Sequence, residues 1–184
     1  VELSEDMIRY FGEEGKGGFF LYGSDSEQLI ARPKEVYDGA MPSGNSVAAL
    51  NLLRLARLTG RTDFEELANA QFEAFADKIN NYPIAYTYML MAYVFAHIKS
   101  SEIVIVGDRS EADTKSFISV INRSFLPNSV IVVKDAADTE QLKTLAPYTE
   151  AQHMIDHKAT AYICQDFTCR EPITEVGKLI EALN

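Results

Sequence analysis

Two cysteines, Cys164 and Cys169, stand near the end of the chain in TAYICQDFTCREP, residues 160–172. Thioredoxin-type redox sites use Cys-x-x-Cys at a helix N-terminus, whereas the spacing here is Cys-x4-Cys and a proline follows. His153 and His157 lie upstream and complete a set of zinc-ligand types. Three alternatives remain open, namely buried thiols, a reversible disulfide and a metal site. Buried thiols are favoured, so we expect neither bound zinc nor a disulfide that the fold requires.

A second polar cluster consists of Arg32, Asp38, Ser43, Asn45 and Ser46, in a loop that precedes an apolar helical stretch. The Asp-Gly pair that starts at Asp38 is typical of a turn, and Ser43 or Asn45 is suited to cap the helix that follows. The same side chains can also hydrogen-bond or protonate a polar ligand. A helix cap can face a cavity as well, so the two interpretations are compatible.

A third segment, VGDRS at residues 106–110, follows a strand-like run. Open α/β sheets bind ligands at the carboxyl ends of their strands. The segment has a single glycine and neither a Gly-x-Gly-x-x-Gly nor a Walker pattern, which makes it a weak nucleotide motif. We therefore expect Asp108 and Ser110 to finish a turn and cap a helix.

The first hundred residues have a helical period. The most apolar stretch, residues 84–98, is too short for a bilayer, which needs about 20 residues, and predicts a buried helix. Further helices are predicted over 47–58 and, with Asp63 as N-cap, over 63–79. Short extended segments at 17–23 and 28–32 predict a hairpin.

After residue 101 the pattern changes to strands that alternate with helices. Strands are predicted at 102–107, 130–133 and 159–164. Helix caps are expected at Ser110, Asp138 and Thr174. This order predicts a small three-stranded parallel sheet with right-handed crossovers. The expected fold class is α/β, with a helical segment at 1–100 and a small α/β domain at 101–184.

Composition limits the classes of partner. The chain has 184 residues, of which 47% are hydrophobic and 24% charged, so it can bury a core. Its formal net charge of -10 argues against nucleic acid and anionic membranes as partners, since both require concentrated Lys and Arg. The N-terminus has no basic segment followed by an apolar one, and cysteines are few, so a cytoplasmic location is expected.

Three stretches in order carry a family resemblance: residues 32–61, RPKEVYDGAMPSGNSVAALNLLRLARLTGR; EIVIVG at 102–107; and TAYICQDFTCREPIT at 160–174. They resemble the C-terminal part of the YyaL-like, spermatogenesis-associated family of thioredoxin-domain-containing proteins. The resemblance implies a longer protein with an N-terminal thioredoxin-like domain, a central α/α toroid similar to six-hairpin glycosidases and sugar 2-epimerases, and a C-terminal α/β region. Residues 1–100 would then be the last toroid helices. The family pattern includes the two cysteines but not the two histidines, which argues against zinc.

If the sugar chemistry of such toroids carries over, Asp38 would be one of a carboxylate pair, Arg32 would orient a carboxylate or ring hydroxyl, and Ser43 and Asn45 would bind a diol. The second carboxylate would have to come from outside this chain. We therefore expect a fragment that is catalytically incomplete, needs no cofactor, and has the rest of its parent protein and a sugar or polyol as partners. The alternatives are a non-catalytic assembly module and a thiol redox partner. A few helices from a larger ring leave apolar surface exposed, which predicts self-association.

Overall fold

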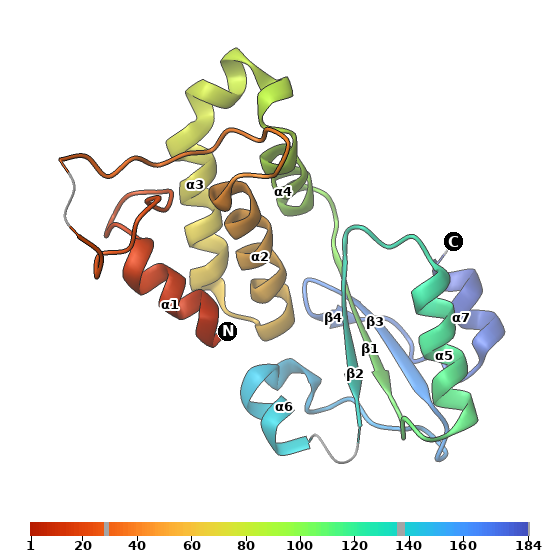
Figure 1. The fold of residues 1–184 in the computed structure, drawn as a ribbon. Coiled ribbons are helices and arrows are strands. Elements are labelled where there is room, and N and C mark those ends of the chain that lie inside the picture. Colours follow the sequence, from red (N-terminus) through yellow and green to blue (C-terminus); the bar gives the residue numbers. More distant parts are fainter. Residues whose placement is uncertain (28–29, 136–138, 184) are drawn as a thin grey trace. The chain divides into compact units, whose positions relative to one another are not determined.

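The computed structural model describes residues 1–27, 30–135 and 139–183 (Figure 1). Helices and one mixed sheet confirm the α/β class. The chain divides into two compact units, the first made of Val1–Ala56 and Arg61–Ile98, the second of Arg57–Gly60 and Lys99–Asn184. Within the described ranges, no helix combines the length and the apolar character that crossing a bilayer requires.

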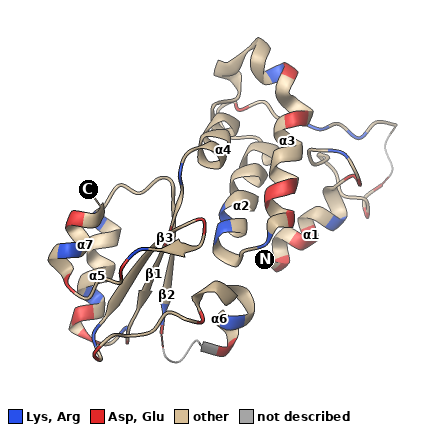
Figure 2. Cartoon of the chain, turned by 180° about the vertical axis from the view of Figure 1, so that it is seen from behind, with Lys and Arg blue, Asp and Glu red and all other residues tan. Residues whose placement is uncertain are grey.

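The first unit is helical. Its elements are α1 (Glu2–Phe11), α2 (Gly44–Thr59, whose last turn groups with the second unit), α3 (Thr62–Asn81), the 3-10 turn η1 (Pro83–Ala85) and α4 (Thr87–His97). The predicted helices at 47–58 and 63–79 correspond to α2 and α3, whereas α1 was not predicted. Asp63 is not the N-cap of α3: that position is Arg61, which pairs with the Asp63 carboxylate at 2.6 Å. Acidic side chains run along α3 (Figure 2), in keeping with the net charge.

The helix predicted over 84–98 forms as η1 and α4, but it is not buried as predicted. Of the eleven residues of α4, all of them described, only Met89, Ala92 and Phe95 are buried. Met91 is 55% exposed and Val94 44% exposed. The sequence of α4 is apolar all round, so its pattern could not show which side of the helix this chain covers.

The hairpin predicted around 17–32 is also not formed. The described residues of this segment contain no strand, and residues 28–29 lie outside the described ones. Backbone groups that would have hydrogen-bonded to a partner strand instead hydrogen-bond to other parts of the unit. The N–H of Phe19 donates to the Asn45 side chain at 2.6 Å, and the N–H of Phe20 donates to the carbonyl of Phe11 at 2.9 Å.

The second unit contains the sheet. Its elements are β1 (Ser101–Val106), α5 (Ala112–Arg123), β2 (Ser129–Lys134), α6 (Thr139–Leu145), the 3-10 turn η3 (Pro147–Thr149), β3 (Thr160–Gln165), β4 (Thr168–Cys169) and α7 (Val176–Leu183). The strand order is β2-β1-β3-β4. The buried residues of β1 pack on α5 and α7 at one face of the sheet, while α6 and η3 lie against the other (Figure 1).

A three-stranded parallel sheet was predicted, and this prediction was wrong in two respects. Among the strands of the described residues, only β1 and β2 are parallel, because β3 is antiparallel to β1, with Val106 opposite Thr160. A fourth strand, β4, pairs antiparallel with β3. Between β2 and β3 the chain forms α6 and η3, and a tight turn at Asp156 and His157 then starts β3 at the end of the sheet where β1 finishes, so the connection is not a parallel crossover.

The predicted caps need correction as well. The N-cap of α5 is Glu111, which makes no side-chain cap hydrogen bond, and Ser110 bonds instead to the side chain of Asp108. Because α7 begins at Val176, Thr174 lies one residue before the N-cap position. Asp138 lies outside the described residues.

Candidate functional site

Asp38 holds two parts of the helical unit together. Its Oδ1 accepts a hydrogen bond from the backbone N–H of Ser43 at 2.9 Å. Its Oδ2 accepts from the N–H groups of Tyr88 and Met89 at 2.8 and 3.1 Å, which are in the first turn of α4. A carboxylate placed there satisfies otherwise unpaired donors and interacts favourably with the helix dipole. Asp38 therefore caps a helix 50 residues away along the chain.

Ser43 and Asn45 are also engaged within the unit. Ser43 is the residue before α2, and its Oγ accepts from the N–H of Ser46 at 3.1 Å, which is an N-cap hydrogen bond. Asn45 is 3% exposed, and its side-chain amide donates to the carbonyls of Phe19 and Glu35 at 3.0 and 2.7 Å. Together with the bond that it accepts from Phe19, Asn45 ties the extended segment to α2.

Arg32 contacts the same segment and also α1, where its Nη2 lies 3.5 Å from the carbonyl of Tyr10. Its Nη2 donates to the carbonyl of Tyr22 at 2.9 Å, and its guanidinium lies 4.1 Å from the centre of the Phe20 ring. Arg32, Asp38, Ser43 and Asn45 thus all stabilise the fold of the 17–46 segment.

A cavity of about 390 Å³ lies beside this loop. Its lining combines aromatic rings with polar groups and includes Phe11, Phe19, Phe20, Glu35, Tyr37 and Asn45. Aromatic faces with a few convergent polar groups are typical of small-molecule sites. The cavity, rather than Asp38, is therefore the candidate ligand site of the helical unit.

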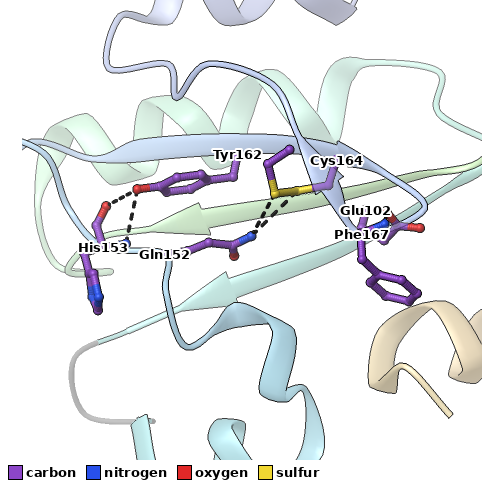
Figure 3. Close-up of a disulfide and its surroundings, with 7 residues drawn as sticks. Glu102, Gln152, His153, Tyr162, Cys164 and Phe167 are labelled. Atoms are coloured by element: carbon purple, nitrogen blue, oxygen red, sulfur yellow. Dashed lines mark hydrogen bonds between the residues drawn. A yellow bond between two sulfur atoms is a disulfide. The ribbon is translucent and has the colours of Figure 1, made fainter.

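The two cysteines form a disulfide in the second unit (Figure 3). Cys164 is completely buried in β3, while Cys169 is exposed in the two-residue strand β4. The favoured alternative, a pair of buried free thiols, is therefore wrong for this structure, and the reversibility of the disulfide stays a prediction. In antiparallel register, Glu102 of β1 lies opposite Cys164, and Cys164 lies opposite Cys169. Directly opposite residues share a face, so the three side chains form one row across three strands.

Gln152 lies over the disulfide. Its Nε2 is 3.3 Å from the Sγ of Cys169 and 3.6 Å from the Sγ of Cys164 (Figure 3). Two groups on the sheet fix the segment that carries it. The buried Nζ of Lys134 donates to the carbonyls of Thr149 and Gln152, at 2.7 and 2.8 Å. The hydroxyl of Tyr162 donates to the carbonyl of the next residue, His153, at 2.8 Å.

Glu102 supports the turn between the cysteines. Its carboxylate is fully buried and accepts a hydrogen bond from the N–H of Phe167 at 3.2 Å. Arg57, which groups with this unit, has its Nη1 3.8 Å from Glu102 and 2.9 Å from Asp166. Burial raises the pKa of the Glu102 carboxyl above its ordinary value, although the Phe167 N–H and the Arg57 charge act in the opposite direction. Burial also raises the pKa of Tyr148, whose ring lies 5.1 Å from that of Phe167, to about 12.

The zinc set is not assembled. The two sulfurs are bonded to each other and so are not thiolates, and His157 lies in a tight turn with a φ of 56°. Among the described residues, no three His, Cys, Asp or Glu side chains gather in a way that could hold a metal.

The strand end at 106–110 is a turn: a Cβ at Gly107 would lie 2.3 Å from the Oγ1 of Thr114, so glycine is needed there for the close packing of α5.

Sequence reasoning missed Gln152 and Glu102. Gln152 has no motif around it. Glu102, in contrast, is a charged residue at the start of a continuous apolar run, and a carboxylate in a strand covered on both faces calls for a specific role.

Comparisons with known proteins found relatives that match this chain over all or most of its length. It is 31% identical over 185 residues to "Spermatogenesis-associated protein 20" of Homo sapiens and 30% identical to that of Rattus norvegicus, with 100% of this chain covered. It is also 30% identical over 167 residues, 91% of the chain, to an uncharacterized protein of Caenorhabditis elegans. The chain spans only 24%, 23% and 22% of the lengths of these relatives. No family model and no solved structure matches.

Proposed function

On the support that these similarities give to the spermatogenesis-associated protein 20 family, we propose that the chain is a non-catalytic assembly module of a longer protein. It docks onto the rest of that protein through α4. The single observation behind this proposal is the exposed apolar surface of α4.

Met91, Val94 and Ile98 form that surface, which we call the α4 stripe. They are 55%, 44% and 50% exposed. Met91 and Val94 are three residues apart and so lie on one side of the helix, and Ile98, whose backbone is extended, directly follows the last residue of the helix. Full burial of one such side chain is worth about 1.5–3 kcal/mol. An apolar stripe of this kind is typical of a helix that packs against another helix.

The proposed occupant is the remainder of the parent chain. The relatives are about four times as long as this chain, which leaves ample sequence to supply helices against α4. From the family resemblance, we expect those helices to be the rest of an α/α toroid. A module of this kind does no chemistry alone, in keeping with the structural use of Asp38, Ser43 and Asn45.

A complementation experiment tests this proposal. The chain and the rest of the parent protein are expressed as separate polypeptides and co-purified. Val94→Lys should abolish co-purification, because it places a charge in an apolar contact. Phe125→Lys is the matched control, since Phe125 is 91% exposed but lies in the second unit. Retention of the complex by Val94→Lys, or its loss in both variants, would contradict docking through α4.

Binding of a sugar or polyol is a second candidate, favoured by the aromatic and polar lining of the 390 Å³ cavity. In the full-length parent, Glu35→Gln should weaken polyol binding measured by calorimetry. Glu73→Gln, on the exposed side of α3, should not. Equal affinities in the two variants would remove the cavity from consideration.

A further inference from the structure

We propose that Cys164 and Cys169 form a thiol–disulfide exchange site that accepts electrons from a dithiol, and that the incoming thiolate attacks the Sγ of Cys169. This site lies in the second unit and is independent of docking through α4.

The two cysteines differ in the exposure of their residues, which gives the expected site of attack. Cys164 is completely buried in β3, between β1 and β4. Cys169 is exposed, in an edge strand of two residues. Disulfide exchange requires contact between the thiolate and a sulfur, so rates follow access to each sulfur. An incoming reagent therefore reaches Cys169 first, and Cys164 is the leaving group.

Gln152 is placed to assist that departure. Its Nε2 lies within 3.6 Å of both sulfurs, so its N–H can hydrogen-bond a thiolate formed at either one. Hydrogen bonds to a charged form favour that form. Lys134 and Tyr162 hold the backbone on either side of this side chain, so the donor is in place before reduction begins.

The reaction balances in two steps. The thiolate of the dithiol forms a bond to the Sγ of Cys169 as the Cys164–Cys169 bond breaks, and the Cys164 thiolate then takes a proton from water. The second thiol of the reagent loses its proton and attacks its own sulfur in the mixed disulfide, which releases the Cys169 thiolate to be protonated. The dithiol is oxidised to a disulfide, and the protein gains two electrons and two protons.

The turn between the cysteines is the part that reduction frees. Asp166 and Phe167 have φ values of 49° and 61°, in the left-handed region that disfavours residues other than glycine. The disulfide and the pairing of β3 with β4 hold this turn closed. Reduction removes the covalent part of that closure, so the turn and β4 are then held by non-covalent contacts alone.

Mapping of the mixed disulfide tests the site on the unmodified chain. Folded protein is incubated briefly with reduced glutathione, a monothiol that needs a second molecule to complete the reduction. The mixed disulfide of the first step is then acid-quenched, alkylated and mapped by mass spectrometry. We expect glutathione on Cys169 and the alkyl group on Cys164. Glutathione on Cys164, or no released thiol until denaturant is added, would overturn the proposal. The rate of reduction by dithiothreitol is then measured with and without a trace of a dithiol oxidoreductase. A faster reduction with the oxidoreductase indicates that a protein dithiol is the electron donor, and an unchanged rate indicates a small-molecule dithiol.

A matched pair of variants tests Gln152. Gln152→Leu should slow reduction by dithiothreitol about tenfold, because the thiolate loses its donor. Gln141→Leu makes the same change at an exposed position of α6 and should leave the rate unchanged. Equal rates in the two variants would remove Gln152 from the exchange step, and the glutathione map would still decide the site of attack.

Discussion

The carboxylate of Asp38 caps α4 through a 2.8 Å hydrogen bond from the backbone N–H of Tyr88, 50 residues further along the chain. A residue that resembles a catalytic acid by its position in the sequence is therefore part of the fold. This geometry makes Asp38 a determinant of stability in the helical unit.

The first prediction is that Asp38→Asn destabilises the helical unit by about 1–2 kcal/mol, because the amide accepts these hydrogen bonds less well and loses the charge at the helix N-terminus. Urea unfolding followed by circular dichroism measures the change. Asp77→Asn, at an exposed position of α3, is the control and should be close to neutral. If the full-length parent shows turnover, Asp38→Asn should leave it unchanged, and a large loss of rate at unaltered stability would instead assign Asp38 a catalytic role.

Asn45→Ala should be more damaging. It leaves the N–H and carbonyl of Phe19 and the carbonyl of Glu35 without the partner that they have now. An unsatisfied buried polar group costs about 1–3 kcal/mol, so we expect a loss of at least about 2 kcal/mol. Asn80→Ala, at an exposed position of α3, provides the comparison. Equal denaturation midpoints for the two variants would show that Asn45 is not a clamp.

The buried carboxyl of Glu102 predicts a pH dependence of stability. Its pKa is raised above the ordinary 4.5, so between these two values the folded state binds more protons than the unfolded state. The free energy of unfolding therefore falls as the pH rises through this window. Glu102→Gln lacks this titration, so its stability relative to the native protein should increase from pH 4 towards neutral pH. Unfolding at a series of pH values measures the difference, and a constant or opposite trend would contradict the raised pKa.

The turn at Asp156 and His157 offers a stabilising substitution. His157 is exposed with a φ of 56°, a conformation in which glycine has no steric cost. His157→Gly should raise the stability of the second unit by about 0.5–1 kcal/mol, after the entropy cost of glycine is subtracted. His153→Gly is the control, because residue 153 is not among those with positive φ, and it should bring no gain.

The α4 stripe predicts association of the isolated chain. Sedimentation at low micromolar concentration should show species larger than the monomer, because exposed apolar side chains lose contact with water when two copies meet. Val94→Lys should shift the distribution to monomer, whereas Phe125→Lys should not. A monomeric native chain that binds no hydrophobic dye would argue against an adhesive stripe.

Local patterns predicted the long elements β1, α2 and α3, but not α1 or β4. The apolar run from Ile103 to Val106 indicated β1, and helical spacing indicated α2 and α3. The direction of β3 was not predictable, because it depends on a turn at Asp156 and His157 that contains no glycine. The strand β4 has only two residues and forms no pattern.

The candidate sites were less predictable, because their partners are distant in sequence. Nothing near Asp38 points to Tyr88, and nothing near Gln152 points to the disulfide. Burial of α4 could not be inferred from an all-apolar sequence, since burial depends on which surfaces are present to cover it. Residue types therefore indicated which polar side chains were candidates. The groups that these side chains contact were known only from the three-dimensional structure.

The central position of β1 has a consequence for the order in which the unit can form during synthesis. Glu102 pairs with Val130 on one side but with Cys164 on the other. The second edge of β1 therefore cannot pair until roughly sixty more residues have been synthesised. A ribosome that adds about 5–20 residues per second needs on the order of 3–12 s to supply them. For that time the most apolar strand of the nascent chain has at least one unpaired edge, the kind of surface that promotes aggregation. Chaperones that bind extended apolar segments would act on the nascent chain in this interval.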